Sequence, residues 1–240
     1  MFDNRIVVID NKNMTLHVKG EHLQTLGSYK FNNFRHAVSV ISNEEVAVTT
    51  GAGRVVEILH ISKTDYVTLR RKIKTESLYF SVCLMDDSNL LLNTFSEERP
   101  MRMVSIYGDE TDLKNLPKKC FKREESMCTC IHHTHMLVLT DKKANSVHMF
   151  EHKSNMKEHV VKHKAIKEPR GVCAGPEGTV FVCCKGTDKL VQISPSGRVL
   201  GSHKLKMRSP FSVCISKDRS KIAVSNSYDG RKELHIYSVN

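Results

Sequence analysis

The amino-acid sequence predicts an all-β protein with the architecture of a six-bladed β-propeller. Three observations support this fold class. Short strands separated by polar or glycine-rich turns follow one another along the 240 residues. A four-residue pattern returns at intervals that match one propeller blade. No apolar run approaches the roughly 18 residues that a membrane-spanning helix needs.

The clearest unit is the stretch 169–193, PRGVCAGPEGTVFVCCKGTDKLVQI. An alternating segment ends in a Gly-Pro-Glu-Gly turn, a compact apolar run follows at 179–184, and a polar turn leads to a third strand at 190–193. This order is typical of a β-meander. One meander cannot bury its own faces, so the unit should recur.

The unit does recur. Its opening pattern, Arg170-Gly171-Val172-Cys173, returns four times, as Phe80-Ser81-Val82-Cys83, Phe211-Ser212-Val213-Cys214, Met127-Cys128-Thr129-Cys130 and Ala37-Val38-Ser39-Val40. The frames end at residues 40, 83, 130, 173 and 214. A period of about 40–50 residues with several short strands per unit is typical of propeller blades.

Taken in order, the strands form six antiparallel units, four of which are complete with four strands each. The first unit has strands at 5–10, 14–19 and 22–31. The second has 36–42, 45–50, 54–61 and 66–74. The third has 79–85, 89–95, 101–107 and an irregular outer strand at 112–121. The fourth has 127–132, 136–141, 146–151 and 156–165. The fifth has 170–174, 179–184, 190–193 and 199–205, and the sixth has 210–216, 221–226 and 234–239.

The first unit lacks its opening strand and the last lacks its fourth strand. We therefore expect residues 1–240 to form a single propeller domain that belongs to a longer multidomain protein, whose upstream residues would complete the closure. Short apolar inner strands and charged outer strands agree with outer edges that face water.

Composition places the protein inside the cell and points to anionic partners. The formal net charge is +11 and the pI is about 9.3, which favours attraction of polyanions such as nucleic acid or acidic protein segments. Four of the eight cysteines share one repeat position, as small core residues do, so we expect reduced thiols. The N-terminus has no signal-peptide pattern. We predict a cytoplasmic protein with no membrane segment.

Several segments resemble the NHL repeat, in which a strand ends in Asp and a turn Asn precedes the next strand. These are NRIVVIDNKN at 4–13, LVLTD at 137–141 with Asn145, and 179–188 after Pro169-Arg170-Gly171-Val172. Together they resemble the C-terminal propeller of TRIM–NHL proteins over essentially the whole chain. The unit at 79–121 departs from the pattern because no Asp follows Asn93, and Cys183-Cys184-Lys185 replaces the usual small residue and Asp.

The resemblance implies a non-catalytic module that binds RNA or protein partners. In that family, ubiquitin-ligase activity lies in an upstream RING domain. This chain has no Cys-x2-Cys pair at RING spacing, so we expect no ligase activity here. The alternative to RNA binding is protein recognition, in which the propeller presents substrates to such a ligase.

Motifs for catalysis or metal binding are weak. The cluster CTCIHHTH at 128–135 is dense in thiols and imidazoles, but Cys130 occupies the repeated core position. His159 and His163 fall on an expected strand and lack a metalloprotease Glu. There is no nucleophile elbow, phosphate-binding loop or dinucleotide fingerprint. We predict no cofactor, no metal, no small-molecule substrate and no enzymatic activity; a propeller enzyme with bound calcium or zinc is a distant third hypothesis.

Basic residues recur once per unit, in four clusters that hold 15 of the 37 lysines and arginines. The clusters are Arg70-Arg71-Lys72-x-Lys74, Lys118-Lys119-x-x-Lys122-Arg123, Lys162-x-Lys164-x-x-Lys167-x-x-Arg170 and Lys204-x-Lys206-x-Arg208. Each falls on a fourth strand or on its link to the next blade. These links emerge on one face of a propeller, so the sequence predicts a basic face there, although lysine on outer strands also protects edges from aggregation.

The candidate RNA- or partner-binding residues are those expected in the links. They are Arg35, Lys74, Arg123, Lys167, Arg170 and Arg208. Aromatic residues near the same links could stack on bases: Tyr29, Phe31, Phe34, Tyr79, Phe121 and Phe211.

Overall fold

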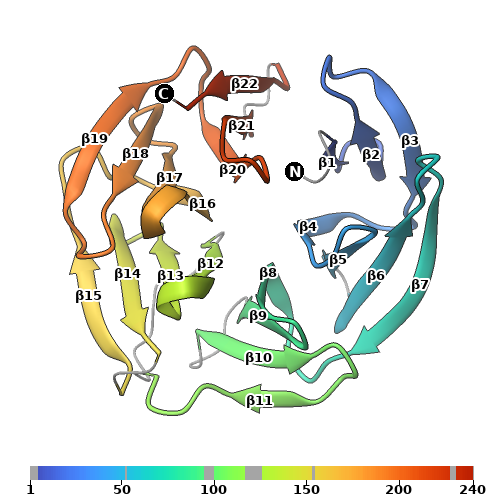
Figure 1. Ribbon diagram of the computed structural model, residues 1–240, viewed down its shortest axis with the longest axis horizontal. Coiled ribbons are helices and arrows are strands. Elements are labelled where there is room, and N and C mark those ends of the chain that lie inside the picture. The colour runs from blue at the N-terminus through green and yellow to red at the C-terminus, as the bar shows by residue number, and fades with distance from the viewer. Residues whose placement is uncertain are drawn as a thin grey trace. The chain divides into compact units, whose positions relative to one another are not determined.

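The computed structural model describes residues 5–51, 53–94, 100–116, 126–152, 155–227 and 231–239. These residues form 22 β-strands and two three-residue 3-10 turns, arranged in six antiparallel sheets. The fold is an all-β, six-bladed β-propeller whose first and last blades have three strands each (Figure 1). The predicted fold class is confirmed. The chain divides into two compact units of three blades each.

The first unit holds three blades. The first blade has the order β1 (Ile6–Asp10), β2 (Thr15–Lys19) and β3 (Thr25–Lys30). The second is β4 (Arg35–Val40), β5 (Glu45–Thr50), β6 (Val55–Ile61) and β7 (Val67–Lys74). The third is β8 (Tyr79–Asp86), β9 (Asn89–Thr94), β10 (Met101–Ser105) and β11 (Glu110–Asp112).

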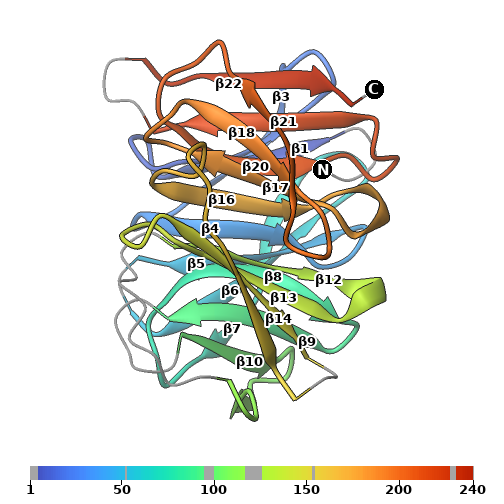
Figure 2. The same ribbon diagram turned by 90° about the vertical axis from the view of Figure 1, so that its left-hand side faces the viewer.

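The second unit holds the other three. The fourth blade has β12 (Cys128–Ile131), β13 (Met136–Asp141), β14 (Ser146–Glu151) and β15 (Lys157–Val161). The fifth has β16 (Pro169–Ala174), β17 (Val180–Cys184), β18 (Lys189–Ile193) and β19 (Val199–Lys204). The sixth has β20 (Pro210–Ile215), β21 (Lys221–Asn226) and β22 (Leu234–Ser238), which lie side by side in Figure 2.

Two predicted boundaries need correction. The outer strand of the third blade is β11, which begins at Glu110 and pairs with β10, whereas the sequence placed it at 112–121. The turn at 106–109 is tighter than expected because the Ser105 Oγ accepts hydrogen bonds from the backbone N–H groups of Tyr107 and Asp109. The outer strand of the fourth blade ends at Val161, so residues 162–165 belong to the link that follows it.

Strand register explains the four-residue pattern. Val82, Val172 and Val213 pair with the buried residues Leu92, Val182 and Val224 of the second strand in their own blades. In the second blade the residue at this position is Val38, which pairs with Val48. The frame that the sequence ended at Val40 is therefore one residue too late, and Ser39 occupies the cysteine position. All four inner strands have a register shift near their start, and in each the aligned valine lies three residues after the first paired residue.

Apolar side chains from neighbouring blades form the core inside each unit. In the second unit, Phe181 and Leu190 of the fifth blade pack with Val213 and Val224 of the sixth. Gly171 permits this close packing, because a Cβ there would lie 2.5 Å from the Phe211 carbonyl oxygen. The glycine in the Arg-Gly-Val-Cys frame is therefore a packing requirement between two inner strands.

Candidate functional site

A polar side chain at the end of a turn fixes the link that enters the next blade. The Asp188 Oδ1 accepts a hydrogen bond from the Ser209 N–H at 2.9 Å, and the Asn145 Oδ1 accepts one from the Glu168 N–H at 2.7 Å. Both Asp188 and Asn145 have positive φ, a conformation that Asp and Asn tolerate well. The turn residues that the sequence grouped into one motif thus hold the links in place.

The turn at 185–188 also joins two basic links of the second unit. On one side, Gly186 N–H donates to the Lys167 carbonyl oxygen at 3.0 Å, and the Thr187 hydroxyl donates to the Ala165 carbonyl oxygen at 2.9 Å. On the other side, the Lys204 Nζ donates to the Thr187 carbonyl oxygen at 3.1 Å. The link at 162–168 and the link at 205–209 therefore lie on either side of one short turn.

We call the exposed cations of these two links, together with Lys204 at the end of β19, the second-unit basic face. Its members are Lys162, Lys164, Lys167, Lys204, Lys206 and Arg208. The predicted site residues Lys167 and Arg208 thus lie in two links that contact the same turn. Burial alternates along the second link, where Leu205 and Met207 enter the core. Because Leu205 and Met207 are buried, the side chains of the alternating residues Lys204, Lys206 and Arg208 point toward solvent.

A cleft of about 540 Å³ opens beside the second link. Its lining residues are Asp188, Lys204, Leu205, Lys206, Met207, Arg208, Asn226, Arg231 and Glu233. Four of these are cationic and two are anionic, so the cleft is positively charged. Asp188 pairs with Lys204 at 3.1 Å and Glu233 with Arg231 at 3.6 Å, so both carboxylates of the lining have a cationic partner.

Arg231 lines the cleft but is not among the predicted site residues. It stands before the last strand, outside the four basic clusters, and its side chain is 83% exposed. The Ser227 N–H donates to the Ser209 carbonyl oxygen at 3.0 Å, which brings the segment before β22 next to the second link. The adjacent pair Arg231-Lys232 was the only available signal in the sequence.

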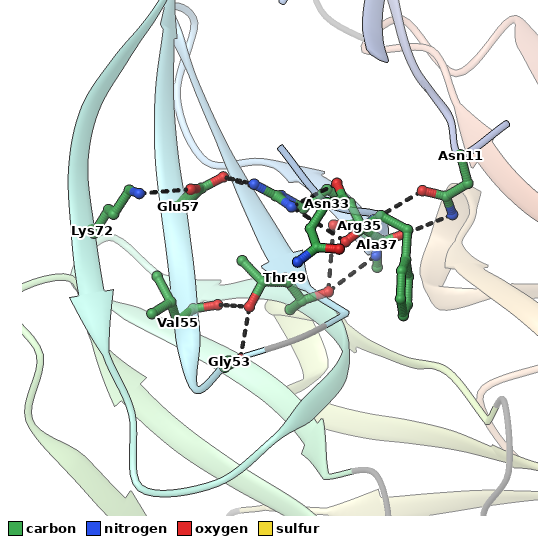
Figure 3. A network of polar contacts seen from close by, with 11 residues as sticks. Asn11, Asn33, Arg35, Ala37, Thr49, Gly53, Val55, Glu57 and Lys72 are labelled. Carbon is green, nitrogen blue, oxygen red and sulfur yellow. Dashed lines mark hydrogen bonds and ion pairs between the residues drawn. The ribbon is translucent and has the colours of Figure 1, made fainter. Parts of the chain in front are cut away.

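Arg35 lies in a different environment from the one predicted. It begins β4 and is 5% exposed, whereas the sequence placed it in an exposed link. Its guanidinium group binds the Glu57 carboxylate, with Nη2 to Oε2 at 2.8 Å (Figure 3). Its guanidinium carbon lies 4.2 Å from the centre of the Phe31 ring. Glu57 also pairs with the exposed Lys72 at 3.4 Å. Arg35 is thus part of a buried network and does not present an exposed charge.

Arg170 is also buried. Its exposed fraction is 1%, and its guanidinium carbon lies 5.7 Å from the centre of the Phe211 ring. Its Nη2 lies 3.9 Å from the Glu168 carboxylate, and its carbonyl oxygen accepts a hydrogen bond from the Thr140 hydroxyl at 2.9 Å. The sequence correctly placed Arg170 at the start of an inner strand, but the expectation that its side chain is available to a ligand is wrong, because the side chain is buried beside Phe211.

The remaining candidates are separate from the cleft. Lys74 is exposed at the end of β7 in the first unit. Arg123 lies outside the described residues, as does Phe121. Among the aromatic candidates, Phe31 and Tyr79 are buried. Tyr29 and Phe211 are half-buried, and Phe34 is 43% exposed. No aromatic residue lines the cleft as it is described.

In the cysteine- and histidine-rich segment at 128–135, the cysteines are buried and the histidines are exposed. Cys128 and Cys130 are buried on β12, and the three histidines that follow lie exposed in or just after a 3-10 turn. Across the described ranges, no group of three or more His, Cys, Asp or Glu side chains is arranged to hold a metal ion. The same part of the chain contains no helix that is long and apolar enough to span a membrane.

Comparison with known proteins identifies the fold and no family. No protein-family model matches the chain, and no curated protein matches it. A luciferin-regenerating enzyme is 10% identical with a TM-score of 0.76, over 98% of this chain and 88% of that one. A protein of unknown function from Bacteroides caccae is 10% identical with a TM-score of 0.71, over 98% and 89%.

Virginiamycin B lyase from Staphylococcus aureus is 13% identical with a TM-score of 0.66, over 99% of this chain and 82% of that one. Identities this low carry information about the fold alone. The similarity shows that this chain shares the β-propeller architecture with proteins of different activities.

Proposed function

We propose that the chain is a non-catalytic binding module that engages RNA through the second-unit basic face and its cleft. The observation that supports the proposal is the arrangement around one turn: the turn at 185–188 is hydrogen-bonded to both basic links, and the six exposed cations belong to these links and to the end of β19. A row of lysines and arginines that spans neighbouring blades suits a polymeric chain of phosphates better than one small anion.

The carboxylates of the cleft support a binding role. Asp188 pairs with Lys204 and accepts the Ser209 N–H, and Glu233 pairs with Arg231. Asp188 and Glu233 are thus engaged in ion pairs, and Asp188 also positions the backbone of the link. A general acid or base would instead face the space where a substrate binds. This proposal keeps the resemblance to the TRIM–NHL propeller as its functional analogy and places the module in the cytoplasm.

RNA binding is tested with the purified chain and a pool of fluorescein-labelled, short single-stranded RNAs at two salt concentrations. The expected result is binding that weakens steeply with salt. The Lys206→Glu/Arg208→Glu variant should lose about tenfold or more in affinity, because two phosphate contacts are replaced by repulsion.

The matched control is Lys217→Glu/Arg219→Glu, which makes the same change in charge. These exposed residues lie in the turn after β20, at the opposite end of that strand from the second link and about 20 Å away along it. The proposal fails if RNA does not bind at low salt, or if both variants lose affinity equally.

The second candidate is recognition of an acidic protein segment, which in a longer protein with a RING domain would present substrates for ubiquitin transfer. The absence of aromatic residues among the described lining of the cleft favours it, since single-stranded RNA binders usually stack bases on aromatic rings. Competition with poly-glutamate distinguishes the two. Displacement of RNA only at a large excess of poly-glutamate supports RNA, and tighter binding of poly-glutamate supports the protein ligand.

A further inference from the structure

Phe34 is the most exposed of the aromatic candidates that the structure describes, at 43%. It stands in the link between β3 and β4, in the first unit. Its ring lies against Gly51, where an added Cβ would come 1.9 Å from the ring atom Cε2. The glycine therefore leaves the room that the ring occupies at the turn after β5.

The backbone of Phe34 is held by several hydrogen bonds. Its carbonyl oxygen accepts one from the Gly51 N–H at 3.1 Å and one from Arg35 Nη1 at 3.2 Å. The same Nη1 donates to the Asn33 carbonyl oxygen at 2.8 Å. The Asn11 side chain bonds the N–H and the carbonyl oxygen of Arg35, at 2.8 and 2.7 Å (Figure 3). The buried Arg35 network thus fixes the link that presents Phe34, so a ligand has little backbone freedom to freeze.

Neighbouring rings hold the side chain as well. The Phe34 and His36 rings meet edge to face, with centroids 5.3 Å apart and an interplanar angle of 80°. The His36 ring in turn lies 4.8 Å from the Phe80 ring. Burial lowers the pKa of His36 below its usual value, so the imidazole is uncharged at neutral pH. A ring that is packed against others and still partly exposed can take a further planar ring by stacking.

Cations lie on the same turn. Arg54 is exposed three residues after Gly51, so their Cα atoms are at most about 11 Å apart. The Arg54 carbonyl oxygen accepts the Thr75 N–H at 2.9 Å, which places the exposed Lys74 beside the turn. The carboxylate of Glu76, in the link after Lys74, pairs with a buried arginine at 3.2 Å. An exposed ring near two cations suits a nucleotide, which has a flat base and an anionic phosphate.

The exposure of this position does not depend on the number of strands in the first blade. Leu78 stands immediately before the first strand of the third blade, as Phe34 stands before that of the second. The complete four-stranded second blade precedes Leu78, and Leu78 is 40% exposed. The position is therefore open to solvent in both blades, and only Phe34 places an aromatic ring there.

We propose that Phe34 stacks a base of single-stranded RNA, while Arg54 and Lys74 hold the adjoining phosphates; the inference rests on the RNA binding proposed above. Every base has a flat π face, so this site adds affinity with little sequence preference. An acidic protein segment offers no base to the ring, so the contribution of Phe34 also separates the two candidate ligands.

The probes are a fluorescein-labelled, short single-stranded RNA and an abasic strand of the same length, in which hydrogen replaces every base. Phe34→Leu keeps an apolar side chain without the ring. It should weaken binding of the RNA about fivefold or more and leave binding of the abasic strand unchanged. The salt dependence of RNA binding should equal that of the wild type, because no phosphate contact is lost.

Two further variants control for the fold. Leu78→Ala shortens an apolar side chain that is similarly exposed at the matching position, and should bind both strands as the wild type does. Gly51→Ala displaces the Phe34 ring without removing it, and should weaken RNA binding as Phe34→Leu does.

Unchanged RNA binding by Phe34→Leu would overturn the proposal, and so would an equal loss of affinity for the two strands. Weaker binding of poly-glutamate by Phe34→Leu would assign the ring to a protein ligand instead. In each of these cases the Lys206→Glu/Arg208→Glu variant still tests the basic face, so stacking can fail while RNA binding stands. If the wild type binds neither strand, both proposals fail.

Discussion

The Asp188 carboxylate accepts a hydrogen bond from the Ser209 N–H at 2.9 Å and forms an ion pair with Lys204 at 3.1 Å. One short side chain thereby ties the turn of the fifth blade to the link that enters the sixth. Asn145 makes the corresponding bond to the Glu168 N–H one blade earlier. The position of the basic links, and with it the position of the cleft, depends on these turn residues.

Asp188→Ala should destabilise the protein by roughly 1–3 kcal/mol, because the partly buried Ser209 N–H loses its acceptor. Asp188→Asn should cost less than Ala, because Asn retains the acceptor oxygen and tolerates the positive φ at this position. Urea denaturation measures both. Lys204→Ala is the control, and its exposed ion pair should contribute no more than about 1 kcal/mol. Equal losses for Ala and Asn would contradict this role of the acceptor.

Arg35→Met should destabilise the first unit by roughly 3–5 kcal/mol, since it leaves the Glu57 carboxylate buried without its main partner. The Arg35→Met/Glu57→Leu double variant should lose less than the sum of the two single changes. The double-mutant cycle compares the free energies of unfolding of the wild type, Arg35→Met, Glu57→Leu and the double variant, each measured by urea denaturation. Additive losses would show that the pair is not coupled.

Acid should weaken the hairpin between β20 and β21. Hydrogen bonds from the hydroxyls of Ser216 and Ser220 lower the pKa of Asp218 from 3.8 to about 2. Because the folded-state pKa is the lower one, the stabilisation is complete above the unfolded pKa and is lost as the pH falls through about 2. Thermal unfolding of wild type and Asp218→Asn between about pH 5 and about pH 2 should converge as the pH falls. A constant difference would contradict the assignment.

The buried cysteines of the fifth blade should be unreactive. Burial raises the pKa of the Cys183 thiol well above its usual range and that of the Cys184 thiol to about 12. Very little thiolate then exists at about pH 8, and the thiolate is the nucleophile. Labelling by a disulfide reagent, mapped by mass spectrometry, should be slow at both sites in the native protein. It should become fast in concentrated guanidinium chloride. Rapid native labelling of Cys184 would count against its burial.

The sequence was sufficient to predict the blades and their order. A period of one blade, short apolar strands and turn residues are local patterns, and hydrophobic burial enforces them wherever the fold repeats. The alternation in Lys204-Leu205-Lys206-Met207-Arg208 also determines which side chains face water, since Leu205 and Met207 join the core. Lys206 and Arg208 could therefore be predicted as exposed cations from the sequence.

Only the tertiary structure determined which arginines are exposed. Arg35 and Arg208 both stand near the start of an inner strand, yet Arg35 turns inward, because Glu57, 22 residues later on β6, provides a buried carboxylate. Burial of a charge depends on a partner that is distant in sequence, and no local pattern reports it. The cleft arises in the same way: Arg208 and Arg231 are 23 residues apart in the sequence, and both line it where the Ser227 N–H bonds to the Ser209 carbonyl oxygen.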